Sequence, residues 1–315
     1  MKKFFISLLK AVGYFGIYLA AQFVVTFIYM IFIMIPVVGK YATGNYDLTN
    51  PAVINQYINE VMEPLLDATM PITILSGLLT VGIVCLIFVC RKKKIAEELS
   101  LRKISGRTVA VLPAMGFGFN LLTGVLFAFL PESWVTSYEE TSNLVFTGEV
   151  WLMAIAVGLM APLVEEFVFR GLIYTRLRKG MPVAVAAVFT ALWFGVMHGH
   201  PLWIVYASIY GLVMIWIFER TGSLLASMLF HFGYNLVAVI EMAVPVNLPD
   251  WTGFVMLGVG VVLSTVGVYG FLKIPKAEDL AEIADVTATQ RYEETKGTTE
   301  DAISQSADEP TENGK

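Results

Sequence analysis

Long apolar runs with few charges are the feature of this sequence that most limits its fold. A helix that crosses the hydrocarbon layer of a membrane needs about 20 mostly apolar residues. Eight runs approach or exceed this length, at residues 11–38, 71–90, 108–130, 150–172, 182–198, 202–218, 223–240 and 251–272. Only 15% of the 315 residues are charged, against about a quarter in soluble proteins. We therefore predict an all-α fold, a polytopic membrane helix bundle with about eight transmembrane helices.

Basic residues mark alternate ends of these runs. Short cytoplasmic loops of membrane proteins collect Lys and Arg. Here such residues precede the first run and follow the second, fourth, sixth and eighth, whereas the intervening loops contain almost none. The first run is also longer than the roughly 7–15 apolar residues of a cleavable signal peptide. We expect an integral, multi-pass protein of the plasma membrane with both termini in the cytosol.

The formal net charge of −5 is unevenly distributed along the chain. Residues 276–315 carry 4 basic and 11 acidic side chains, and the remaining residues carry 17 basic and 15 acidic ones. Neither part is strongly basic, so a nucleic acid partner is not expected. Residues 275–315 also contain few large apolar side chains, which predicts an acidic, disordered cytosolic tail. Cys85 and Cys90 lie in one apolar run, and we interpret them as packing residues.

Polar side chains inside the predicted spans are costly there and therefore point to function. The candidate catalytic residues are Glu165, Glu166, Arg170, His198, His231 and Asn235. Residues four apart share one face of a helix, so Glu166 and Arg170 can neutralise each other. Glu165 points about 100° away and lacks this partner. We therefore predict that Glu165 is the chemical group and that Glu166 and Arg170 support it.

Each candidate also has a simpler explanation when it is taken alone. Glu166 and Arg170 are compatible with a purely structural ion pair, and a single buried histidine is often a hydrogen-bonded core residue. Together, an unpaired carboxylate, two histidines and an amide can activate water, either at a zinc ion or by direct base catalysis. The His-Glu-x-x-His motif of soluble zinc proteases is absent from the sequence.

Three short motifs in this region resemble those of the CPBP family, which comprises CAAX proteases and bacteriocin-processing enzymes and is also called the Abi family. The family pattern is Glu-Glu-x-x-x-Arg, then Phe-x-x-x-His, then His-x-x-x-Asn, each on its own membrane helix. Residues 165–170, 194–198 and 231–235 match it in order. The resemblance covers about residues 150–240 and leaves the first three spans, the last span and the tail outside it.

The resemblance implies an intramembrane endopeptidase with a metalloprotease-like site. In such a site the first glutamate, Glu165, activates water, and the histidines and asparagine bind a metal or stabilise the oxyanion. We therefore expect His198 and His231 to hold zinc or another divalent metal ion and Asn235 to donate to the oxyanion. Arg170 would fix Glu166 and could also bind a substrate carboxylate.

The expected organisation has three parts. Residues 1–149 form an N-terminal transmembrane region with three spans, and apolar residues at helical spacing near 53–65 predict an amphipathic helix on the outer surface. Residues 150–274 form the catalytic transmembrane domain with the last span, and residues 275–315 form the tail. The expected partners are the lipid bilayer and a membrane-associated peptide or protein substrate. The sequence specifies neither the substrate nor the oligomeric state.

If every helix were straight and upright, the candidate residues would lie at different depths in the membrane, measured from the nearest cytosolic basic residue. At 1.5 Å per residue, Glu165 lies roughly 17 Å from Arg176, whereas His198 lies roughly 28 Å from Lys179. A tilted helix or a non-helical stretch near Gly180 would have to remove this difference.

Two other classes of function remain open from the sequence. One is a non-catalytic membrane protein that confers immunity or acts as a scaffold, with the polar residues holding helices together. The other is a metal or proton transporter, which is disfavoured because the first three spans contain almost no ionisable residues and no inverted repeat is evident.

Overall fold

The structure is a computed structural model that describes residues 1–146, 148–244, 249, 251–277 and 279. The chain divides into two compact units, Met1–Ile274 and Pro275–Lys315. The predicted disorder of the acidic tail falls almost entirely outside the described residues. The first unit contains the predicted spans.

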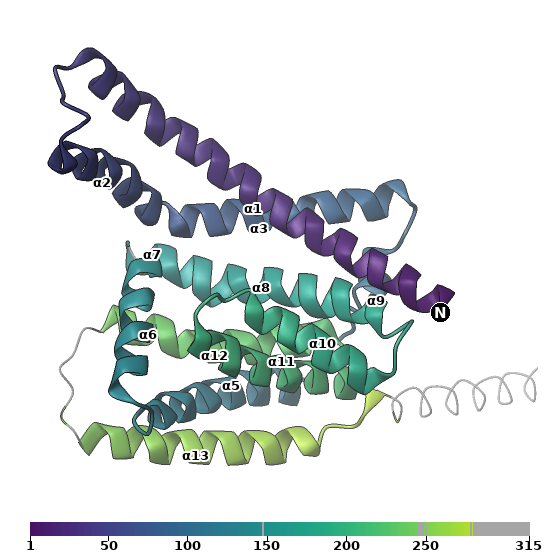
Figure 1. Ribbon diagram of the computed structural model, residues 1–315. Coiled ribbons are helices and arrows are strands. Elements are labelled where there is room, and N and C mark those ends of the chain that lie inside the picture. The colour runs from purple at the N-terminus through teal and green to yellow at the C-terminus, as the bar shows by residue number, and fades with distance from the viewer. Residues whose placement is uncertain (147, 245–248, 250, 278, 280–315) are drawn as a thin grey trace, which may run out of the picture. The chain divides into compact units, whose positions relative to one another are not determined.

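Most of the described residues are helical, and none of them forms a strand (Figure 1). In chain order the longer helices are α1 (Lys2–Thr43), α2 (Pro51–Asp67), α3 (Thr69–Cys90), α5 (Gly106–Phe127), α6 (Glu132–Val145), α10 (Val183–Val196), α11 (Pro201–Thr221), α12 (Leu224–Ala243) and α13 (Trp251–Leu272). The short α4 (Ile95–Glu98) follows α3. Between α6 and α10, one continuous helical span consists of α7 (Val150–Met153), η1 (Ala154–Met160), α8 (Ala161–Glu166), η2 (Phe167–Tyr174) and α9 (Thr175–Leu177).

Seven of the described helices are long and apolar enough to cross a membrane, which confirms the polytopic helical fold. The prediction of a full span at 182–198 is wrong, because α10 contains only 14 residues. A helix of that length rises about 21 Å, less than the roughly 30 Å of a hydrocarbon core. The chain turns after Val196 because Gly199 adopts a φ of +77° and Pro201 starts α11.

The predicted amphipathic helix of the first loop is present as α2. The side chain of Asn50 caps its N-terminus by accepting a hydrogen bond from the backbone N–H of Ala52. The sequence reasoning did not predict α6, which is too polar to appear as an apolar run. In α6, Ser137 and Tyr138 contact His200 in the loop before α11.

Glycines let α5 and α12 approach each other closely. A Cβ atom at Gly116 would collide with the backbone of Phe230, and one at Gly233 would collide with the backbone of Pro113. Small residues at such crossings allow helix backbones to pack in a membrane, where apolar burial alone gives little driving force. This crossing fixes the part of α12 that carries the third sequence motif.

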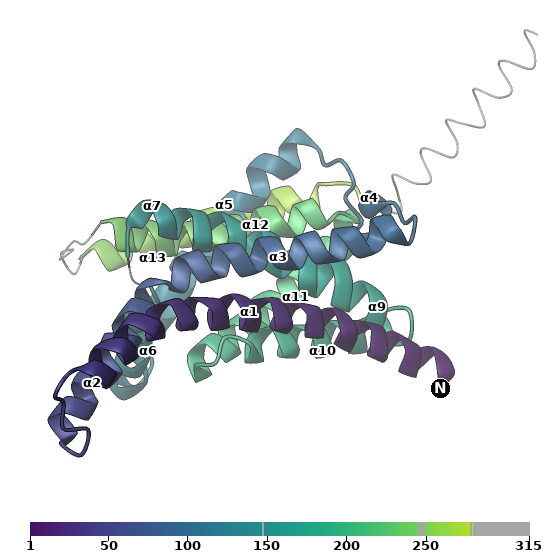
Figure 2. The same cartoon turned by 90° about the horizontal axis from the view of Figure 1, so that it is seen from above.

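The N-terminal helices pack against the span that carries the glutamates. Figure 1 shows α1 crossing α3, and Figure 2 shows the same two helices adjacent to each other. Phe15 and Tyr18 of α1 contact the ring of Phe169 in η2. The span α1, which lies outside the family resemblance, therefore packs against the π-helix that follows the two glutamates.

Candidate functional site

Glu165 and Glu166 lie in the span Val150–Leu177, at the point where it changes from α-helix to π-helix. The two residues end α8, and the eight-residue π-helix η2 follows at once. A second π-helical segment, η1, precedes α8. Such segments are rare and frequently occur at functional sites. The sequence reasoning did not predict them, because nothing in the composition distinguishes them from α-helix.

Glu166 and Arg170 form the predicted ion pair. The Arg170 Nη1 atom donates to Glu166 Oε1 at 2.7 Å, and both side chains are fully buried. The Nη2 atom of Arg170 also donates to the carbonyl oxygen of Gly211 in α11, at 3.2 Å. A buried charge requires this kind of pairing because its desolvation is otherwise strongly unfavourable. The pair therefore links the glutamate span to α11.

The imidazole of His231 lies between the two glutamates. Its Nδ1 atom is 2.9 Å from Glu166 Oε1, and its Nε2 atom is 3.8 Å from Glu165 Oε2. A carboxylate that is paired with Arg170 can only accept a hydrogen bond, so Nδ1 carries the proton and donates. In the neutral imidazole, Nε2 then presents a lone pair toward Glu165. Glu166 thus orients His231, and the side chain of Glu165 stays 22% exposed.

His198 lies in the turn after α10 and not in a membrane helix, which corrects the prediction. Its Nδ1 atom is 2.9 Å from the carbonyl oxygen of Phe194. Because a carbonyl oxygen only accepts, Nδ1 is the donor and the Nε2 atom of the neutral ring is left with a lone pair. In the neutral form of each histidine, Nε2 is therefore the nitrogen that carries the lone pair.

Phe194 connects the three motifs, a role that the sequence reasoning did not assign to it. The guanidinium of Arg170 lies 4.4 Å from the centre of the Phe194 ring. The ring also makes edge contacts with His198, at 4.8 Å between centroids, and with His231, at 6.1 Å. A cation above an aromatic face is stabilised by the quadrupole of the ring. One buried aromatic side chain thus holds groups from all three motifs together.

Asn235 faces the same segment from α12. Its Nδ2 atom donates to the carbonyl oxygen of Val157 in η1 at 2.9 Å. Asn235 lies four residues after His231, so both side chains project from one face of α12. An amide carries two N–H donors, so one N–H of Asn235 is not used by the Val157 bond.

The site fits a metal ion in ligand type but not in ligand number. The two imidazole Nε2 atoms with lone pairs suit a divalent metal, and the Glu166 contact with His231 is the outer-shell support that metal-bound histidines usually have. A hydrolytic zinc site needs three protein ligands. Among the described residues, no three His, Cys, Asp or Glu side chains lie in a group that could hold a metal ion.

Two polar atoms at the core of the site have no hydrogen-bond partner among the described residues. They are Oε2 of Glu166 and Nε of Arg170. Buried polar atoms without a partner are uncommon and occur at functional sites or where an ordered water binds.

The comparisons with known proteins agree with the motifs. Residues 147–237 match the family model described as type II CAAX prenyl endopeptidase Rce1-like. This segment contains all six candidate residues, so the predicted family resemblance is confirmed over it. No curated protein and no solved structure matches the chain.

Proposed function

We propose that this protein is a membrane endopeptidase, similar to the CAAX prenyl endopeptidases, that hydrolyses a peptide bond in a membrane-associated peptide or protein. The observation that carries the proposal is the arrangement of Glu165 and His231. Their facing atoms are 3.8 Å apart, which exceeds a direct hydrogen bond and suits a bridging water. Glu166 and Arg170 hold the histidine in place behind them.

In the first step, Glu165 acts as the general base. Its carboxylate accepts a proton from a water that also donates to His231 Nε2, and the water oxygen attacks the carbonyl carbon of the scissile bond. A positioned base of this kind contributes about 10²–10⁴-fold to a rate. Glu165 suits the role because it is partly exposed and does not share the buried ion pair.

As the water attacks, negative charge develops on the carbonyl oxygen, and the second N–H of Asn235 donates to this oxyanion with increasing strength. In the second step, the tetrahedral intermediate collapses and the carbonyl re-forms. Protonated Glu165 then returns its proton to the leaving amine as the C–N bond breaks. Arg170 is fully buried and already binds Glu166 and Gly211, so we assign it a positioning role.

Zinc or another divalent metal is a separate part of the proposal. Nε2 of His198 and His231 would supply two of its ligands, and the His231 lone pair would then bind the ion instead of accepting a hydrogen bond from the water. Such an ion would polarise the scissile carbonyl and add to the oxyanion stabilisation. Metal analysis of the purified protein tests it independently of activity. About one metal per chain is expected, with loss of the metal in His231→Ala. Metal-free protein that remains active in a strong chelator would overturn this part alone.

A peptide-cleavage assay with purified protein in detergent tests the enzyme. The substrates are a fluorescent peptide with a farnesylated CAAX C-terminus and the same peptide without the lipid. Glu165→Gln and His231→Ala should each lower kcat by about 10²-fold or more. The matched control is Glu139→Gln on α6, an exposed glutamate outside the site, which should cleave like the wild type. If Glu165→Gln and His231→Ala both turn over the substrate as fast as the wild type, the proposal is refuted.

The alternative is a non-catalytic immunity or scaffold protein. The observation in its favour is that Arg170 and Asn235 bind backbone carbonyls of other helical segments, as polar residues do when they associate helices. A cell-protection assay separates the two functions. A scaffold keeps its protective activity in Glu165→Gln, and an enzyme loses it.

A further inference from the structure

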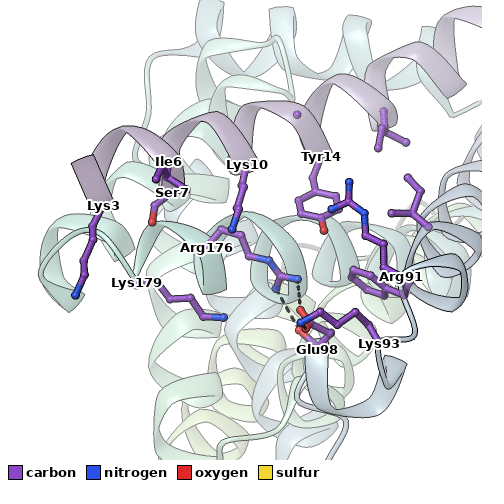
Figure 3. Close-up of a pocket in the computed structure, with 14 residues that line it drawn as sticks. Lys3, Ile6, Ser7, Lys10, Tyr14, Arg91, Lys93, Glu98, Arg176 and Lys179 are labelled. Atoms are coloured by element: carbon purple, nitrogen blue, oxygen red, sulfur yellow. Dashed lines mark hydrogen bonds and ion pairs between the residues drawn. The ribbon is translucent and has the colours of Figure 1, made fainter. Parts of the chain in front are cut away.

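A cavity of about 620 Å³ lies away from the six candidate residues, between α1, α3, α4 and the end of the glutamate span. Six basic side chains line it, with one carboxylate, that of Glu98. The basic residues are Lys3, Lys10, Arg91, Lys93, Arg176 and Lys179. We refer to this cavity as the basic pocket (Figure 3).

The carboxylate of Glu98 neutralises only part of this charge. It accepts hydrogen bonds from Arg176 Nη2 at 2.7 Å and from Lys93 Nζ at 2.9 Å. The side chains of Lys10 and Lys179 are directed toward this pair in Figure 3 and make no ion pair within the described part of the chain. The basic pocket therefore has a strong excess of positive charge and suits an anion.

The guanidinium of Arg176 is held rigidly at the back of the pocket. Its side chain is 6% exposed, and Nη1 donates to the backbone carbonyl oxygen of Glu98 at 3.2 Å. The same guanidinium lies 5.3 Å from the ring centre of Tyr14 and 5.9 Å from that of Phe88. A cation fixed in this way loses little conformational freedom when an anion binds.

The basic pocket lies where two membrane spans end, beside the N-terminal part of α1. Helix α3 ends at Cys90, and the glutamate span ends at Leu177. The ends of spans lie at the level of the lipid headgroups. The pocket is therefore placed at the depth at which the phosphates of a bilayer occur.

The walls of the pocket are apolar on the side of the spans. Ile6, Ile17 and Ile87 line it, and Ile6 is 43% exposed. A small soluble anion gains no binding energy from an apolar wall, whereas an acyl chain can pack against it. Basic pockets between membrane helices are typical binding sites for anionic headgroups.

We propose that the basic pocket binds the phosphate group of an anionic phospholipid, with the acyl chains lying along the isoleucine wall. The lipid would bridge α1 to the end of the glutamate span. This inference does not depend on the proposed peptidase reaction, because the pocket contains none of its residues.

Native mass spectrometry of the delipidated protein tests the proposal. Phosphatidylglycerol is titrated against the full chain in detergent, with phosphatidylcholine as the zwitterionic comparison. Separate arms use glycerol 3-phosphate and inorganic phosphate, which carry the anion without acyl chains. We expect one phosphatidylglycerol to bind at least about tenfold more tightly than phosphatidylcholine, and the two soluble anions to bind more weakly than either.

The matched variants change two charges each. Lys10→Gln with Lys179→Gln should weaken phosphatidylglycerol binding by about tenfold or more, because each lysine near a headgroup contributes separately. Lys103→Gln with Lys273→Gln is the control, since both lysines are exposed, follow the same basic pattern and lie outside the pocket. Lys10→Arg with Lys179→Arg keeps the charges and should restore binding.

Three results would overturn the proposal. The first is equal phosphatidylglycerol binding by the pocket variant and the wild type. The second is equal binding of the anionic and zwitterionic lipids. The third is inorganic phosphate binding as tightly as the lipid, which would assign the pocket to a soluble anion. A thermal melt of each variant identifies any loss of binding that comes from unfolding, and the arginine variant then provides the decisive comparison.

Discussion

The same change from Glu to Gln should affect different properties at the two adjacent glutamates of α8. At Glu166 it should lower the stability of the fold, and at Glu165 it should lower the catalytic rate. In Glu166→Gln, the guanidinium of Arg170 loses the carboxylate that lies 2.7 Å from it, and both side chains are fully buried. The variant also weakens the acceptor that orients His231. In Glu165→Gln, a partly exposed carboxylate is removed from a position 3.8 Å from the histidine.

The expected magnitudes differ because the environments differ. Removing one partner of a buried ion pair costs about 3–5 kcal/mol, because the other charge stays buried without compensation. For a protein of this size, that cost lowers Tm by roughly 10 °C. The Glu165→Gln change should alter the free energy of unfolding by less than about 1 kcal/mol, since partly exposed ionic contacts contribute little. Its kcat should nevertheless fall by about 10²–10⁴-fold.

Thermal unfolding in detergent and peptide cleavage are measured on the same preparations. Glu139→Gln serves as the exposed control for both measurements. A third variant combines Glu166→Gln with Arg170→Met. It removes both charges and should recover most of the lost stability, because no buried charge is then left without its partner.

The reasoning is refuted if Glu165→Gln destabilises the protein as much as Glu166→Gln does. It is also refuted if the double variant remains as unstable as Glu166→Gln. Either result would mean that the Glu166–Arg170 pair is not the buried support of the site.

Three further predictions concern the surroundings of the site. Gly233→Leu should prevent close packing of α12 on α5 and lower Tm strongly, whereas Gly124→Ala on α5, where a Cβ meets nothing within 4 Å, should not. Phe194→Leu removes the ring that contacts three charged or polar side chains of the site, and kcat/KM should fall by about tenfold or more because the groups lose their positions. The hydrogen bond from Lys93 lowers the pKa of Glu98. Glu98 therefore stabilises the fold above its unfolded pKa of about 4.3 and loses this effect as pH falls through the lower folded pKa. The Tm values of Glu98→Gln and wild type should therefore converge once the pH is below that lowered pKa.

Local rules of spacing predicted the parts of the structure that depend on one helix alone. The i to i+4 relation placed Arg170 beside Glu166, and the pair is present with both members buried. Apolar length identified seven of the eight predicted spans among the described residues and failed for 182–198, where the helix is too short to cross the hydrocarbon core. Helical spacing in the first loop identified α2 in the same way.

The remaining features depend on contacts between helices or on small changes in backbone geometry. The π-helical segment η2 differs from an α-helix by one residue in its hydrogen-bond register, which no composition reveals. The contact of Arg170 with Gly211 joins residues 41 positions apart in sequence. Such a pairing follows from how the helices cross, and crossing angles depend on packing along whole helix faces.

His198 illustrates this limit most clearly. Its depth was calculated along a straight helix from Lys179, and that distance is too great for it to meet the glutamates. The helix ends at Val196, and His198 is tied back through its Nδ1 atom to the carbonyl oxygen of Phe194. The ring of Phe194 in turn packs against Arg170 and His231. His198 therefore contacts Arg170 and His231 only through the ring of Phe194, and no hydrogen bond or ion pair joins it to either glutamate among the described residues.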